Sequence, residues 1–283
     1  MIPLKEALIR KNRQVNLDQD EIIDFIIKNY SLSGTPYISN LNWSDFNIYD
    51  VIKINNKHEV NIAFPDRTNE GSTVGEVTLM ANNKNLQKLT NGKFVFGIIE
   101  GNFYCGGTNI TSLEGAPKAC YNFYCGGTDI TSLKGIENMR CNIGDNSVYV
   151  PWSRTGAIYN SKRVGEINCS KCDKLKSLEG APEFISADIT GKRIQEEGKF
   201  NALTCKHCVN LTSLDGLTRY EVPAFIDLTG CRRLQSIDEI INYFETRDSN
   251  KFSDLKFYTK DSKYLIGAGY QFPAKFKKLI ETL

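Results

Sequence analysis

Residues 102–117 read NFYCGGTNITSLEGAP, and residues 122–135 read NFYCGGTDITSLKG. The two stretches are nearly identical and are offset by 20 residues. Self-similarity at such a period is typical of a chain built from stacked repeats, and it outranks local signals because it sets the whole architecture. Weaker copies of the pattern begin at Ile167, Leu203 and Ile226. The sequence therefore predicts a repeat fold.

Each copy has two alternating apolar residues, then a threonine or cysteine, an apolar residue and a closing leucine. In the first clear copy these residues are Phe103, Cys105, Thr108, Ile110 and Leu113. The pattern resembles the leucine-rich repeat, in a short form similar to repeats of bacterial effectors and, still more, of tailed-phage accessory proteins. The resemblance covers residues 74–237. It implies an α/β leucine-rich-repeat solenoid with a parallel sheet on its concave face.

With weaker copies included, we count about eight. Their second strand positions are Leu79, Cys105, Cys125, Ile143, Cys169, Ile189, Cys205 and Leu228. A solenoid must cover the two ends of its core. We therefore expect residues 1–73 to form an N-terminal α+β cap and residues 238–283 to form an α-helical C-terminal cap.

The expected N-terminal cap contains a helical region and a hairpin. Residues 1–30 read as helix, and the stretch Ser31–Pro36 is expected to end it. Strands are expected within residues 44–64, on either side of a turn at Asn55–Lys57. Near the other end, Leu255 and Phe257 suggest a final strand.

Nine cysteines lie within the predicted repeats. The pairs Cys169-x-x-Cys172 and Cys205-x-x-Cys208 have the spacing of a four-cysteine zinc site. The repeat instead assigns these residues to core positions, where a free cysteine acts as a small hydrophobe. If the copy at residues 187–194 intervenes, the two pairs lie two strands apart, roughly 9–10 Å, too far for one zinc ion. We predict buried thiols and no metal or cofactor; a metal site or redox sensing is the alternative.

Composition narrows the functional classes. The net charge is +2 with only two histidines, which argues against nucleic-acid binding and leaves little acid–base chemistry. The chain lacks an apolar run of membrane-spanning length, and Lys5 and Glu6 interrupt any signal-peptide core. We therefore expect a cytoplasmic protein, in the host cytoplasm if it is phage-encoded, that does not enter a membrane.

The predicted binding surface is the concave face. Residues that alternate with the buried strand positions point outward there, and tyrosine is enriched where proteins bind one another. The alternative is that the tyrosines only pack on each other. The concave-face candidates are Tyr104, Tyr124, Asn142, Asn168, Lys171, Lys206 and His207.

A second candidate surface is the stretch YVPWSRTGAIYNSKRVG, residues 149–165, which does not fit the repeat. Extra residues in a repeat protein usually emerge as a loop on one face, and Trp, Tyr and Arg dominate interface energetics. The alternative is a loop folded over the repeats. The loop candidates are Trp152, Arg154, Tyr159, Lys162 and Arg163.

These observations favour a non-enzymatic protein-binding module, a phage or bacterial cytosolic protein that binds and inhibits or redirects a host protein. A component of an anti-phage defence is one concrete target. The alternative is a virion-associated or self-assembling structural protein. Catalysis is disfavoured because phosphate-loop, metalloprotease and serine-hydrolase motifs are missing from the sequence. Nucleic-acid binding would need a continuous basic stripe. The oligomeric state stays open.

Overall fold

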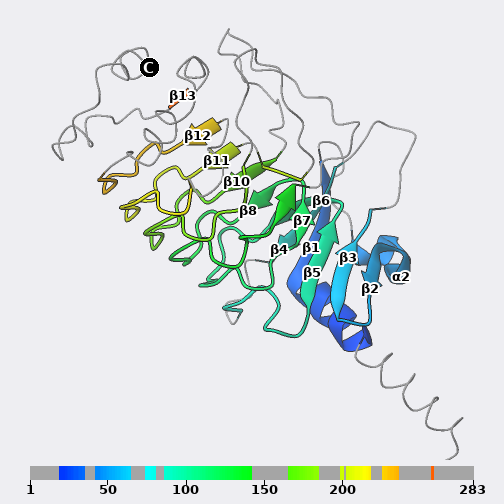
Figure 1. The fold of residues 1–283 in the computed structure, drawn as a ribbon. Helices are drawn as coiled ribbons and strands as arrows, with labels where there is room; N and C mark the ends of the chain where they lie inside the picture. Colours follow the sequence, from blue (N-terminus) through cyan, green and yellow to red (C-terminus); the bar gives the residue numbers. More distant parts are fainter. Residues whose placement is uncertain are drawn as a thin grey trace, which may run out of the picture.

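The computed structural model describes residues 19–35, 42–64, 74–80, 86–141, 165–184, 198–200, 202–217, 225–235 and 256–257. These residues form two β-sheets that share one hydrophobic core (Figure 1). The larger sheet extends along the molecule as successive copies of the repeat follow one another.

The larger sheet has eight strands in the order β1-β4-β6-β8-β10-β11-β12-β13. The first pair, β1 with β4, is antiparallel, and all later pairs are parallel. The strand bounds are β1 Tyr30–Thr35, β4 Val74–Leu79, β6 Gly101–Tyr104, β8 Phe123–Tyr124, β10 Glu166–Asn168, β11 Ala202–Thr204, β12 Phe225–Asp227 and β13 Lys256–Phe257.

The smaller sheet has five strands in the order β2-β3-β5-β7-β9. Its bounds are β2 Ile52–Ile54, β3 Glu59–Ile62, β5 Val95–Ile99, β7 Ala119–Cys120 and β9 Arg140–Cys141. The pair β2–β3 is antiparallel and the others are parallel. Because β5 leads directly into β6, and β7 into β8, consecutive copies contribute one short strand to each sheet.

Helical structure among the described residues lies toward the N-terminus. A helix spans residues 19–29, a 3₁₀ helix η1 spans Trp43–Asp45, and α2 spans Ile48–Val51. At η1, the backbone N–H of Asn42 donates to the Asp45 carboxylate at 2.8 Å. In the described part of the chain, none of the helices is long and apolar enough to span a membrane.

Aromatic rings fill the core where the two sheets meet. Phe103 and Phe123 stack on adjacent strands, with centroids 5.7 Å apart and planes 2° from parallel. Phe96 of β5 packs edge-on against Phe103 at 5.3 Å and against Tyr30 of β1 at 5.2 Å. The buried Tyr30 hydroxyl donates to the Leu89 carbonyl at 2.5 Å, so its polar atom is satisfied inside the core.

The turn after each closing leucine depends on glycine. Gly135 and Gly180 have φ of 108° and 90°, a region that side chains with a Cβ avoid. A Cβ on Gly180 would lie 2.4 Å from the Lys134 backbone nitrogen of the preceding copy. These glycines therefore let neighbouring copies approach closely, and they explain the recurrent S-L-x-G sequence.

The predicted fold class is wrong. The structure is a mixed α/β fold with two largely parallel sheets, not a leucine-rich-repeat solenoid with one concave sheet and an α-helical C-terminal cap. The sequence pattern did not reveal the second sheet because β7 and β9 have only two residues each, too few to show alternation. Within residues 238–283, the described part is β13, a strand; the helices predicted there lie outside the described residues.

Two predicted copies were expected between strands that the structure pairs directly with each other. Strand β8 pairs directly with β10, and β10 pairs directly with β11. A strand at Ile143 therefore does not separate β8 from β10, and a strand at Ile189 does not separate β10 from β11; Ile143 and Ile189 themselves lie outside the described residues. Both stretches lack the S-L-x-G turn, which follows β6, β8, β10 and β11, but so do the copies of β4 and β12, so this turn alone does not identify a stacked copy.

Candidate binding surface

The larger sheet has a face that points away from the aromatic core. Strand alternation turns Phe103 and Phe123 into the core and their neighbours Tyr104 and Tyr124 to the opposite side. We call this opposite side the tyrosine face. The two tyrosine rings stack with centroids 4.3 Å apart and planes 7° from parallel. Both rings are half-buried, and burial, together with the nearby Glu76 carboxylate, raises the pKa of Tyr104 to about 12.

A chain of hydrogen bonds runs across the tyrosine face beside the rings. The Asn102 amide donates to Glu76 at 3.3 Å, and the Asn122 amide donates to Asn102 at 2.9 Å. The backbone N–H of Glu166 then donates to the side-chain amide oxygen of Asn122 at 2.9 Å, and the Thr204 hydroxyl donates to the Glu166 carboxylate at 2.5 Å. Five strands, β4, β6, β8, β10 and β11, are thereby joined by side chains as well as by backbone pairing.

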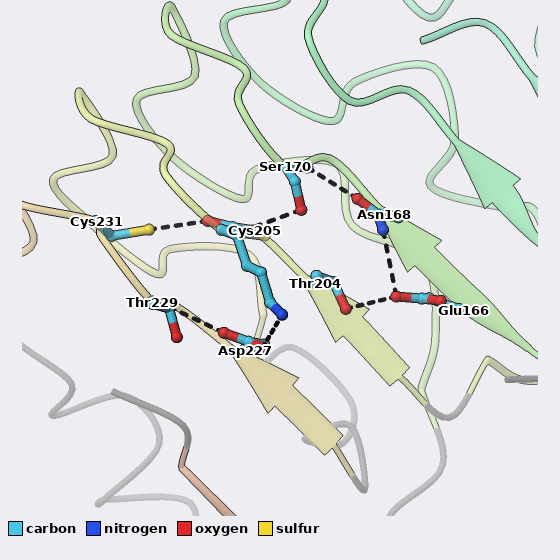
Figure 2. Close-up of polar contacts among 9 residues, drawn as sticks. Glu166, Asn168, Ser170, Thr204, Cys205, Asp227, Thr229 and Cys231 are labelled. Carbon is cyan, nitrogen blue, oxygen red and sulfur yellow. Dashed lines mark hydrogen bonds and ion pairs between the residues drawn. The ribbon is translucent and has the colours of Figure 1, made fainter. Parts of the chain in front are cut away.

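Polar contacts continue to the last copies, as Figure 2 shows. The Lys206 ammonium lies 3.0 Å from the Asp227 carboxylate, and the Asp227 side chain is 5% exposed. Asp227 also accepts the backbone N–H of Thr229 at 3.1 Å. In the copy that contains β10, the Asn168 side chain donates to Glu166 at 3.4 Å and accepts the backbone N–H of Ser170 at 3.0 Å. These contacts fix the side chains of this half of the face before any partner arrives.

The nine cysteines are all buried free thiols, which confirms their predicted place in the core. Three of them bond from one copy to the preceding one. The thiols of Cys172, Cys208 and Cys231 donate to the carbonyls of Cys125, Cys169 and Cys205 at 3.2, 3.0 and 3.0 Å. Cysteine at the turn thus joins successive copies by hydrogen bonds.

Contrary to the prediction, the two C-x-x-C pairs do not lie two strands apart. Cys169 and Cys205 lie on neighbouring strands, not two strands apart, and their Sγ atoms are 2.9 Å apart. Among the residues that the structure describes, no group of three or more His, Cys, Asp or Glu side chains is arranged to hold a metal ion. The cysteine spacing is accounted for by the stacking of the copies.

The buried thiols give a testable prediction. We expect a thiol reagent such as iodoacetamide to label the native protein slowly and all nine cysteines after denaturation. The physical reason is that burial denies the reagent access, and it also raises the pKa of Cys105, Cys120 and Cys205. Hydrogen bonds with Cys125 and Cys169 lower the pKa of Cys172 and Cys208, so burial alone protects these two thiols. Mass spectrometry of the labelled protein measures the count. Rapid labelling of a native cysteine would contradict the core assignment of that residue.

Several predicted site residues come together and others lie outside the described residues. Tyr104, Tyr124 and Asn168 belong to the tyrosine face, while Lys171, Lys206 and His207 lie on the turns that follow β10 and β11. The predicted residues outside the described ranges are Asn142, Trp152, Arg154, Tyr159, Lys162 and Arg163.

Sequence reasoning missed four residues of the tyrosine face: Glu76, Asn102, Asn122 and Glu166. Each of the last three lies two positions before an outward residue that was identified. Residues two apart on a strand share a face, so the same alternation would have found them. Their hydrogen bonds hold these side chains in fixed positions beside the tyrosines. We call these four residues, together with Thr204 and Asp227, the polar floor.

The arrangement offers two stacked aromatic rings, and amides, carboxylates and the Lys206 ammonium that are held by contacts with one another. Scans against family models, against curated proteins and against solved structures give no match to this chain.

Proposed function

We propose that the protein is a non-enzymatic binding module that recognises another protein through the tyrosine face. The observation that carries the proposal is the stacked pair of Tyr104 and Tyr124, half-buried on a sheet face whose other side chains bond to one another. Tyrosine supplies a large contact area and loses little conformational entropy on binding. A pair already fixed by stacking loses still less, which favours affinity.

The polar floor supports binding rather than chemistry. Its carboxylates and amides are engaged with neighbours in the same sheet, as in the contacts of Glu166 and Asp227. Such groups set specificity because a partner must match their fixed positions. The resemblance to short-repeat proteins of tailed phages and bacteria extends the proposal to a host protein as the partner, which the bound module would inhibit or redirect.

The test is affinity capture from bacterial lysate with a double variant, Tyr104→Ala with Tyr124→Ala. We expect one enriched protein with the wild type and at least roughly a tenfold loss with the variant, because truncating two interface tyrosines each removes over about 1 kcal/mol. Quantitative mass spectrometry measures the enrichment. The matched control is Tyr49→Ala, a tyrosine of α2 that is 57% exposed and lies outside the tyrosine face.

Capture that survives the double variant would place the partner elsewhere on the protein and contradict the proposed site. Failure to capture a specific protein would contradict the host-binding proposal. In that case, size-exclusion chromatography would test the alternative of a self-assembling structural protein.

A further inference from the structure

Five turns at the edge of the larger sheet share one unusual backbone conformation. Each follows the cysteine or leucine that comes directly after a strand of a stacked copy, and each has one residue with positive φ. The five residues are Gly107 (68°), Gly127 (68°), Lys171 (59°), His207 (57°) and Gly230 (77°). Glycine adopts this region freely, whereas a residue with a Cβ is strained there. Three copies have glycine at this position and are unstrained. The two consecutive copies with Lys171 and His207 are strained.

The side chains at the two strained positions, Lys171 and His207, are both exposed. The turns stack directly, because the backbone N–H of Lys171 donates to the Lys206 carbonyl at 2.7 Å and that of His207 donates to Thr229 at 2.7 Å. The imidazole of His207 lies over the next turn, where a Cβ on Gly230 would come 2.2 Å from its Nδ1. Gly230 therefore provides the space in which the His207 ring rests.

The charges around these turns are mainly positive. Lys206 precedes His207, and two exposed arginines follow on the next turn. Three carboxylates are close: Asp227 is buried in its ion pair with Lys206, Asp173 is exposed two residues after Lys171, and Asp129 of the preceding copy pairs with Lys174 at 3.0 Å. We call this set the basic edge; its members are Lys171, Lys206, His207, Arg232 and Arg233.

We propose that the basic edge binds an acidic segment of the protein partner that the tyrosine face contacts. The inference rests on the proposed function, since it specifies the chemistry of that partner. Strain retained at two neighbouring turns indicates that their side chains have a role that glycine cannot fill. The basic edge continues the row of turns that begins with Gly107 and Gly127 beside the tyrosines, so one partner segment reaches both surfaces.

The distribution of charge favours an acidic polypeptide over nucleic acid. The chain has 35 basic and 33 acidic residues, and the basic edge covers only three turns. Three turns at the strand spacing cover roughly 10 Å. At the tyrosine end the equivalent positions are uncharged glycines. A nucleic acid needs basic groups along the whole length of its backbone contact, whereas a few carboxylates match a short edge.

The experiment uses full-length protein and a fluorescent oligo-glutamate peptide, measured by fluorescence anisotropy at low salt. The variant is Lys171→Gly with His207→Gly, which gives these turns the residue found in the other three copies. We expect saturable binding by the wild type and a roughly fivefold or greater weakening in the variant, as the loss of exposed charge contacts predicts. The melting temperature of the variant should not fall, because glycine relieves the strain.

Lys53→Ala is the matched control, because it removes one exposed lysine far along the chain, in β2, and should leave the affinity unchanged. The inference is overturned if the wild type does not bind the peptide, if the glycine variant binds it equally well, or if an oligothymidine of equal charge binds at least as tightly.

The two proposals fail separately. Lysate capture that is lost in the tyrosine variant but unchanged in the glycine variant would leave the proposed function standing and overturn the acidic-segment inference. Peptide binding that depends on Lys171 and His207, without specific capture from lysate, would support the basic edge and contradict the host-binding proposal.

Discussion

Replacing Phe123 with alanine is expected to lower the free energy of unfolding by about 3–5 kcal/mol. The Phe123 side chain is fully buried and stacks on Phe103 with their rings 5.7 Å apart. Truncation removes this contact and leaves a cavity that the backbone pairing of β6, β8 and β10 prevents from closing. Urea denaturation followed by circular dichroism measures the change.

The next residue along the strand is the matched control. Tyr124 points to the opposite face and is half-buried, so Tyr124→Ala should cost clearly less stability than Phe123→Ala. Equal losses for the two variants would contradict the assignment of one face to the core and the other to binding. The comparison also shows whether Tyr124→Ala, one of the two substitutions in the variant used for partner capture, leaves the protein folded.

The second large effect is expected for Gly180→Ala. Two penalties add: φ of 90° is unfavourable for alanine, and the new Cβ would lie 2.4 Å from the backbone nitrogen of Lys134. Backbone cannot yield as a flexible side chain does, so we expect a loss of roughly 3 kcal/mol or more, or failure to fold. Thermal and urea unfolding measure it.

Gly107→Ala separates the two penalties. Gly107 also has positive φ, 68°, but a Cβ there would meet nothing within 4 Å. Its loss should be about 1 kcal/mol, from backbone strain alone. If the two alanine variants were equally stable, close contact between the copies at the S-L-x-G turns would not be the reason for glycine there.

Sequence alone located the stacked copies because their chemistry repeats. Each predicted copy that ends in S-L-x-G contributes a strand to the larger sheet, as β8 and β11 do. Alternation placed Cys125 inside and Tyr124 outside, and both placements are confirmed. These features are predictable because they depend on local period, which a single sequence contains.

The second sheet and the direct pairing of β10 with β11 were not predictable in the same way. Strands of two residues, such as Ala119–Cys120, depend on pairing with distant strands and show no period of their own. The N-terminal region shows the same limit. The stretch Ser31–Pro36 was expected only to end a helix, but Tyr30–Thr35 forms β1, which pairs antiparallel with β4. Of the two strands expected within residues 44–64, the first is shortened to Ile52–Ile54 by α2.

The number of strands between the tyrosine face and the basic edge sets the distance between these two surfaces. Tyr104 lies on β6 and His207 follows β11, three neighbouring pairs away, which is about 14 Å. A segment that contacts both needs at least about four extended residues or about ten helical ones, so free amino acids and dipeptides are too short. Adding or deleting one copy between them would change this distance by one strand spacing, about 4.8 Å, while the local chemistry of each half stayed the same. The length of partner segment that this protein requires can therefore change by one strand spacing at a time, while the side chains that contact the segment stay the same.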